Sequence, residues 1–129
     1  YNIERRRHNL KIWLENLDSK KFKTSFDDDE NSNFALPLIM NHGYEDRLQI
    51  NDDFSGVCDI LDLSGVEYRL GTSGGGNQAL QPYLENYEYR IVGNLDNVNY
   101  IHKNSLYIGN HTDLTDEQII NLCKQLNDV

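Results

Sequence analysis

Residue types that could contact a ligand are concentrated in segment 65–84, GVEYRLGTSGGGNQALQPYL. Its first part alternates apolar and charged residues with the period of two that is typical of a half-buried strand. The glycines that follow interrupt regular structure, because glycine loses the most backbone entropy on ordering. Directly after them come Asn77, Gln81 and Tyr83, two amides and an aromatic ring beside backbone that carries no side chains. The segment therefore predicts a ligand-facing surface, with an ordinary glycine-rich turn as the alternative.

The spacing of the remaining polar residues predicts no catalytic group in this chain. The glycines match neither Gly-x-x-x-x-Gly-Lys-Ser/Thr nor a strand-to-helix Gly-x-Gly-x-x-Gly, the two common phosphate-binding loops. No Ser-His-Asp arrangement or carboxylate pair emerges. The histidine of most interest is His111, because it follows Gly109 and Asn110 at the end of a predicted strand, where a side chain can project into a cleft. Capping of the final helix region is the alternative.

Cysteines and acidic residues do not form a metal-binding pattern. Cys58 and Cys123 have no Cys-x-x-Cys spacing, and both are expected to be buried thiols. An acidic run begins at Asp27, but the sixth and twelfth positions counted from it are Ser32 and Leu38, where an EF-hand needs glycine and glutamate. The sequence therefore predicts no metal site.

Length and composition predict one globular domain over residues 1–129. The chain is 38% hydrophobic and 26% charged, which suits a protein with one two-layer core. Its formal charge of −9 argues against a nucleic-acid partner, because that affinity rests mainly on lysine and arginine. No apolar run reaches the roughly 18 to 20 residues of a membrane span. We expect a cytoplasmic protein without a membrane partner and, because Tyr1 opens directly into a helical pattern without Met, a piece of a longer one.

Hydrophobic periodicity predicts interleaved helices and short strands. Helices are expected over 1–17, from a cap at Asn51 or Asp52 to Gly65, from a cap at Asp96 to Asn104 or Ser105, and from a capping box of Thr115 and Gln118 through Leu126. Strands are expected over 34–40, 65–70, 88–95 and 106–108, and Pro37 favours an edge position for the first. This order predicts an α/β fold, an α+β two-layer sandwich with helices on a small mixed or antiparallel sheet.

The apolar faces of three helices supply the predicted core. They comprise Ile3, Leu10, Trp13, Leu14 and Leu17, then Phe54, Val57, Cys58 and Leu61, and finally Ile119, Leu122, Cys123 and Leu126. The basic run of the first helix, together with His8 and His102, is expected to be solvated. Segment 41–49 is expected to be a turn or irregular strand, with His42, Tyr44 and Arg47 as possible polar contacts.

Two stretches together resemble the C-terminal small domain of the DegT-type (DegT/DnrJ/StrS) sugar-nucleotide aminotransferases, which use pyridoxal phosphate (PLP). They are GVEYRL followed by GGGN and QPY, and YIGNH followed by LTDE. The resemblance covers nearly the whole chain. The GGGN and GNH forms are more similar to the branch that contains the 4-keto-6-deoxysugar 3-dehydratases. Thr112 and Asp113 depart from the family pattern, which often has proline there, and the triple glycine is richer than the usual loop.

The resemblance implies the small domain of a fold-type I PLP enzyme, with residues 1–17 as the end of the helix that joins its two domains. The cofactor lysine and the groups that hold PLP would lie in a preceding large domain, so this chain alone is expected to be inactive. The complete enzyme would be a homodimer acting on a nucleotide-linked keto sugar for deoxyamino sugar, polysaccharide or lipopolysaccharide biosynthesis. It would be an aminotransferase if the cofactor position holds lysine, or a 3-dehydratase if histidine replaces it.

The same resemblance implies roles for five residues of a sugar-nucleotide site. Asn77 and Gln81 would hydrogen-bond sugar or phosphate oxygens, Arg69 would supply charge, and Tyr83 would form a wall. The family has a histidine at the position of His111, which would complete the substrate site. A stand-alone, non-catalytic α/β binding module that uses the loop 71–83 is the alternative from a different functional class.

Overall fold

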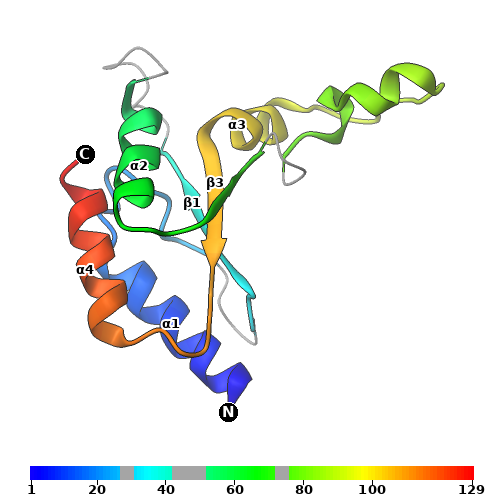
Figure 1. The fold of residues 1–129 in the computed structure, drawn as a ribbon. Coiled ribbons are helices and arrows are strands. Elements are labelled where there is room, and N and C mark those ends of the chain that lie inside the picture. The colour runs from blue at the N-terminus through cyan, green and yellow to red at the C-terminus, as the bar shows by residue number, and fades with distance from the viewer. Residues whose placement is uncertain (27–30, 42–51, 72–75) are drawn as a thin grey trace.

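The computed structural model describes residues 1–26, 31–41, 52–71 and 76–129, as well as the side chains of these ranges apart from 52–54. Within these residues the chain forms four α-helices, three strands and two short 3₁₀ helices, and Figure 1 shows their arrangement. In chain order these are α1 Asn2–Asn16, β1 Ala35–Ile39, α2 Asp52–Leu63, β2 Tyr68–Leu70, η3 Gln78–Leu80, η4 Pro82–Asn86, α3 Asp96–Asn104, β3 Ser105–Gly109 and α4 Asp116–Asn127. The predicted polar contacts His42, Tyr44 and Arg47 lie outside the described residues.

The three strands form one antiparallel sheet in the order β1-β3-β2. The last strand in sequence is therefore the central one, with Leu106 opposite Leu38 on one side and Leu70 on the other. Pro37 lies on edge strand β1, as predicted, where its missing N–H removes no hydrogen bond from the middle of the sheet. The predicted antiparallel sheet of an α+β fold is confirmed.

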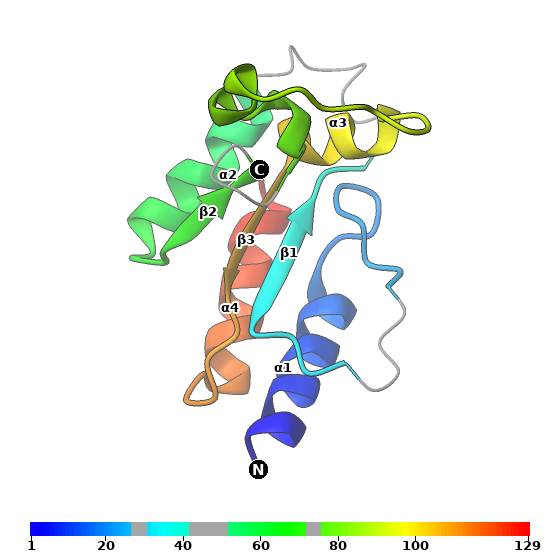
Figure 2. The same cartoon turned by 90° about the vertical axis from the view of Figure 1, so that its right-hand side faces the viewer.

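Helices α1, α2 and α4 cover one face of this sheet, and Figures 1 and 2 show them on the same side of the strands. The core between the two layers consists of buried apolar side chains: Leu10, Trp13, Leu17, Phe22, Leu36, Leu38, Met40, Val57, Leu61, Leu106, Ile108, Ile119, Cys123 and Leu126. Most of the residues predicted for the core belong to it. Ile3 does not, because it lies in the first turn of α1, beyond the end of the sheet, and is 56% exposed.

Local capping signals place the helix ends where the sequence predicts them. Thr115 and Gln118 make both hydrogen bonds of a capping box at the start of α4. Gly65 follows α2 at a φ of 66°, a conformation that glycine adopts without steric cost. The start of α3 differs from the prediction: Asp96 is its first residue, and Leu95 occupies the cap position without a side-chain hydrogen bond.

The strand predicted over 88–95 is absent. Residues 78–95, called the arm below, carry η3 and η4 and then continue without regular structure. Figure 1 shows the arm projecting away from the sheet beside α3. A strand needs a neighbour for its backbone hydrogen bonds, and the projecting arm has no strand of the sheet beside it. The alternation of Tyr89 and Ile91 with polar residues therefore does not mark a buried face, because both side chains are exposed.

No helix in the described part of the chain combines the length and the apolar character required to cross a membrane.

Candidate functional site

Asn77, the first of the predicted ligand-binding amides, is buried and joins the glycine loop to α3. Its Oδ1 accepts a hydrogen bond from the backbone N–H of Ala79 at 2.9 Å and so caps η3. Its Nδ2 donates to Oδ1 of Asn99 at 2.6 Å. Its backbone N–H donates to Nδ1 of His102 at 3.1 Å. Asn77 therefore holds the start of the arm against α3 through the groups that were expected to face a ligand.

Close approach to α3 explains two of the glycines before Asn77. A Cβ on Gly76 would lie 2.4 Å from Nδ1 of His102, and a Cβ on Gly71 would lie 2.7 Å from the carbonyl oxygen of the same residue. Neither contact is sterically possible, so a side chain at either position would push the loop away from the helix. Close packing against α3 therefore requires glycine at both ends of the loop. Residues 72–75 between them lie outside the described residues. The expectation that His102 is solvated is wrong, because it is half-buried beneath this loop.

Gln81 and Tyr83 lie further along the arm. Gln81 is half-buried between η3 and η4. The ring of Tyr83 is exposed, and its hydroxyl donates to Oε1 of Gln78 at 2.7 Å. An exposed ring held in place by a hydrogen bond can form the wall of a binding surface.

Arg69 lies on β2 with its side chain in solvent. Its Nη1 donates to the carbonyl oxygen of Tyr68 at 3.0 Å, and its Nη2 is 3.9 Å from a carboxylate oxygen of Glu67. Both residues of this ion pair are more than half exposed, so water screens the attraction. The guanidinium is therefore accessible to an anionic ligand.

His111 lies at the opposite end of β3 from α3. A strand rise of about 3.3 Å per residue separates the two ends of this five-residue strand by about 13 Å. The ring is 74% exposed, accepts a hydrogen bond from the backbone N–H of Asp113 at 3.3 Å and lies 3.5 Å from its carboxylate. The structure thus puts Asn77 against α3, with Gln81 and Tyr83 further along the arm, and leaves His111 apart from all three at the far end of β3.

Two buried asparagines that the sequence analysis did not single out connect the chain near His111. Nδ2 of Asn110 donates to the carbonyl oxygens of Arg6 at 3.1 Å and Asn33 at 2.9 Å. Its Oδ1 accepts from Nδ2 of Asn9 at 3.0 Å, and Nδ2 of Asn9 also donates to the carbonyl oxygen of His111 at 3.0 Å. The Gly-Asn-His motif therefore contains a residue that ties β3 to α1 and to the segment before β1.

Part of the basic run on α1 forms an ion-pair cluster with α4, so the expectation that the whole run is solvated is wrong. Nη2 of Arg5 donates to Oδ1 of Asp116 at 2.8 Å, and Nε2 of His8 lies 2.9 Å from Oδ2 of the same carboxylate. Arg5 also donates to the carbonyl oxygen of Leu114. The hydrogen bond with His8, followed by the one with Arg5, lowers the pKa of Asp116. This cluster joins the two helices at the edge of the core.

The two thiols are unsuited to nucleophilic chemistry. Cys123 is buried, and burial raises its pKa to about 12. Cys58 is only half-buried, in contrast to the prediction, yet desolvation still raises the pKa of its thiol. A reactive cysteine needs a lowered pKa, because the thiolate is the nucleophile.

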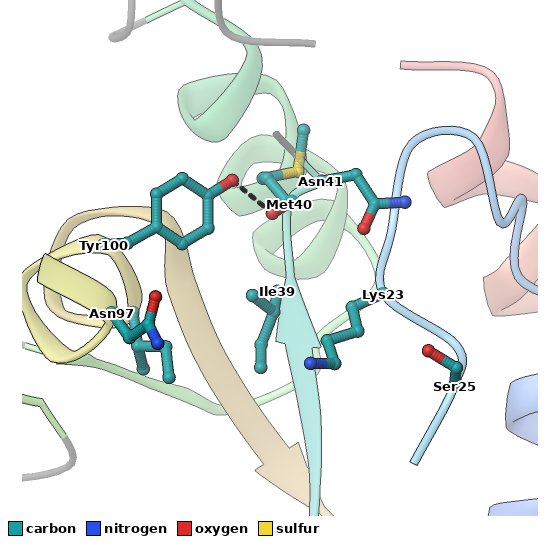
Figure 3. Close-up of a pocket in the computed structure, with 8 residues that line it drawn as sticks. Lys23, Ser25, Ile39, Met40, Asn41, Asn97 and Tyr100 are labelled. Atoms are coloured by element: carbon teal, nitrogen blue, oxygen red, sulfur yellow. Dashed lines mark hydrogen bonds between the residues drawn. The ribbon is translucent and has the colours of Figure 1, made fainter. Parts of the chain in front are cut away.

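A cavity of about 430 Å³ lies on the other side of α3, between this helix, the end of β1 and the segment around Lys23. Figure 3 shows Lys23 and Asn97 extending toward each other in front of Ile39. Tyr100 lies above them, and its hydroxyl donates to the carbonyl oxygen of Met40. Helix α3 thus presents Asn99 and His102 to the glycine loop and other residues to this cavity. Nothing in the sequence analysis pointed to the cavity, because its residues come from distant segments.

The described lining of this cavity does not fit PLP. Enzymes hold this cofactor through a lysine imine and an acidic or basic partner for the pyridine nitrogen. Lys23 lines the cavity beside α3, but no described residue lining that cavity is acidic or an arginine. We therefore assign no PLP chemistry to this cavity.

No protein-family model matches the chain, and no curated protein matches it. The fold is similar to a solved structure described as a crystal structure of GDP-4-keto-6-deoxymannose-3-dehydratase with a trapped PLP-glutamate geminal diamine. The two share a fold. The TM-score is 0.77 at 24% identity, over 96% of this chain. The match spans 31% of the dehydratase, so this chain corresponds to about a third of that structure. The fold that the sequence resemblance implied is confirmed.

Proposed function

We propose that this chain is the small domain of a PLP-dependent enzyme that acts on a nucleotide-linked keto sugar. The observation that carries the proposal is the agreement in fold over 96% of this chain with part of a PLP-containing sugar-nucleotide dehydratase. The GGGN, QPY and YIGNH motifs support the same proposal, because they resemble the same group of enzymes. PLP would be held by a large domain that precedes these residues.

Dehydration at carbon 3 of the sugar is the first candidate reaction, because the structure that matches in fold is described as a 3-dehydratase. Amino transfer, which the sequence resemblance implies for most of the family, is the second. The residue that decides between them would be the lysine or histidine at the cofactor position of the large domain. A homodimer, a cytoplasmic location and a role in lipopolysaccharide biosynthesis remain predictions.

The proposal assigns substrate contacts to the accessible polar residues. Arg69 would attract the anionic part of the nucleotide sugar, and Gln81 and Tyr83 would contact it from the arm. Asn77 would contribute mainly by holding the arm against α3, since its amide already bonds to Ala79 and Asn99. His111 would contact a different part of the ligand from the far end of β3.

The first experiment is to sequence the coding DNA upstream of Tyr1 in its source. An open frame that continues into a large domain supports the enzyme, and the residue at its cofactor position predicts the reaction. Purified full-length protein would then be incubated with GDP-4-keto-6-deoxymannose and glutamate, and the sugar product examined by NMR. Loss of the oxygen at carbon 3 indicates a dehydratase, whereas gain of nitrogen indicates an aminotransferase. A start codon directly ahead of Tyr1 would contradict the proposal and leave the stand-alone binding module.

Matched variants of the full-length enzyme test the assigned contacts. Arg69→Gln and Tyr83→Ala should raise KM for the nucleotide sugar by about tenfold, as expected for loss of a charge-assisted hydrogen bond or an aromatic contact. Arg90→Gln and Tyr89→Ala remove the same groups from exposed positions further along the arm and should leave KM within about twofold. Equal effects at both pairs would rule out the assigned roles.

A further inference from the structure

The cavity beside α3 has the size and the mixed lining of a small-molecule site. Its volume of about 430 Å³ lies within the roughly 300 to 1,000 Å³ that is usual for ligand pockets. The side chains of Ile39 and Ile101 and the ring of Tyr100 supply apolar surface. Lys23, Ser25 and Asn97 supply an ammonium, a hydroxyl and an amide from two segments that are far apart in the sequence.

Hydrogen bonds hold both walls of this cavity to the end of β1. The backbone N–H of Lys23 donates to the carbonyl oxygen of Ile39 at 2.8 Å. Nδ2 of Asn41 donates to the carbonyl oxygens of Ser19 at 2.7 Å and Phe22 at 2.9 Å. On the opposite wall, the Tyr100 hydroxyl donates to the carbonyl oxygen of Met40. The cavity is therefore formed before any ligand arrives, which reduces the entropy cost of binding.

The donors that line the cavity are available to a ligand. Within the described residues, the side chains of Ser25 and Asn97 have no hydrogen-bond partner. The ammonium of Lys23 has no carboxylate partner there and lies 5.7 Å from the centre of the Phe26 ring. Figure 3 shows the ammonium and the Asn97 amide on opposite sides of the Ile39 side chain. The neighbouring carboxylate of Asp96 is occupied by Nδ2 of Asn94 at 2.7 Å.

Within the described lining of the cavity, charge favours an anion on an otherwise acidic protein. The chain carries a formal charge of −9, yet the described lining of the cavity contains one lysine and no acidic residue. Asn97 also lies in the first turn of α3, where the backbone N–H groups give a partial positive charge. A phosphate group has three terminal oxygens that can accept from an ammonium, an amide and a hydroxyl together. A carboxylate group has only two such oxygens and is smaller than a phosphate group, so it would leave more of the cavity empty.

We infer that this cavity binds a phosphomonoester, with its phosphate between Lys23 and Asn97 and its organic part over Ile39 and the ring of Tyr100. The inference rests on the cavity alone and does not depend on the proposed sugar-nucleotide activity. The two sites lie on different sides of α3, so either can fail without the other.

An NMR titration of the 15N-labelled chain, whose core is built from its own residues, tests this inference. Phenyl phosphate serves as the probe that carries both a phosphate and a ring, and inorganic phosphate and phenol carry one part each. Phenyl phosphate should shift the amide signals of 23–25 and 97–101 and bind more tightly than inorganic phosphate. Phenol should not bind at the same concentrations. Shifts spread over all basic residues, or equal binding of phenol, would overturn the inference.

Variants separate a specific contact from general attraction of an anion. Lys23→Gln should weaken phenyl phosphate about tenfold, the usual effect of one hydrogen bond to a charged group. The matched control, Lys103→Gln, removes the same charge from an exposed position of α3 and should change affinity less than about twofold. Asn97→Asp should abolish binding through repulsion, and its exposed position keeps the fold intact. Equal losses for the two lysine variants would overturn the inference.

Discussion

The arm and the rest of the molecule use apolar residues in opposite ways. The sheet with α1, α2 and α4 and the segments that connect them, called the body here, contains every one of the buried hydrophobic residues described. The arm contains none, and most of its large apolar residues are exposed: Leu80, Tyr83, Tyr87, Tyr89, Ile91 and Val92. Hydrophobic residues in this one short chain therefore serve two purposes. Those of the body fold the chain, whereas those of the arm remain available for contact with another surface.

Helix α3 connects these two regions. It follows the arm directly and continues into the central strand β3, while Asn99 and His102 hold the start of the arm through Asn77. Polar contacts over a short stretch are weaker than burial of a core. We therefore expect the arm to detach locally without unfolding the body.

The largest expected effect is that of a cavity in the body. Leu106→Ala removes a buried side chain from the central strand and should lower the free energy of unfolding by about 3 kcal/mol. Tyr89→Ala, in the arm, is the matched control and should change it by less than about 0.5 kcal/mol. Urea denaturation followed by circular dichroism measures both. Similar losses for the two variants would show that the arm belongs to the folding core.

A smaller loss is expected from the buried asparagine near His111. Asn110→Ala removes the donor for the carbonyl oxygens of Arg6 and Asn33 and the acceptor for Asn9. It should lower the free energy of unfolding by about 2 kcal/mol, because buried polar groups lose their partners. His111→Ala is the control, since its exposed ring should contribute little. If both variants lose the same free energy of unfolding, the buried amide of Asn110 contributes no more than the exposed ring of His111, and the role assigned to Asn110 is wrong.

A still smaller global effect is expected where the arm joins α3. Asn77→Ala removes the cap of η3 and the hydrogen bond to Asn99, with a cost of about 1 kcal/mol. The loss should be local, so limited proteolysis within 78–95 should become faster while the urea midpoint changes little. Glu88→Ala, at an exposed position further along the arm, should leave the cleavage rate nearly unchanged. Unchanged proteolysis of the Asn77 variant would contradict the role assigned to this residue.

The smallest effect concerns the ion-pair cluster between α1 and α4. Hydrogen bonds with His8 and Arg5 lower the pKa of Asp116 below its ordinary value of 3.8. A lowered pKa in the folded state means that the carboxylate stabilises the fold above the unfolded pKa. This stabilisation is lost as the pH falls through the folded pKa. Because the carboxylate is about half exposed, water and salt screen the effect.

Asp116→Asn should therefore reduce the difference between the urea midpoints measured at neutral pH and in acid. Asp113→Asn provides the control, because that carboxylate is largely exposed and lies only near His111. A pH dependence that is unchanged in the Asp116 variant would show that the cluster contributes nothing to stability.

Elements with a strong local pattern could be predicted from the sequence. The α4 capping box, the glycine cap after α2 and the edge position of Pro37 all follow from the chemistry of a few neighbouring residues. Leu10, Trp13 and Leu126 were predicted to be buried because their helices are amphipathic. In each case the local pattern and the tertiary contacts favour the same structure.

The errors occur where the partner is distant in the sequence. The alternation in 88–95 satisfied the pattern of a strand, but pairing needs a second strand that only the folded chain can bring near. The packing of the glycines at 71 and 76 against His102 could not be read from the sequence, and the ligand-facing surface predicted there stays a prediction. The cavity between Lys23 and Asn97 has no local signal at all.

The four helices, the three strands of the sheet, the caps after α2 and before α4 and most of the core thus follow from the sequence, because backbone sterics and the burial of an amphipathic face act over one or two turns. Only the tertiary structure decided which polar residues meet. In the folded chain Asn77 lies against α3, and His111 lies apart from it at the far end of β3. Lys23 lies opposite Asn97 in the cavity. The physical reason is that hydrogen bonds and cavities depend on distances between remote segments, and no local spacing of residue types encodes those distances.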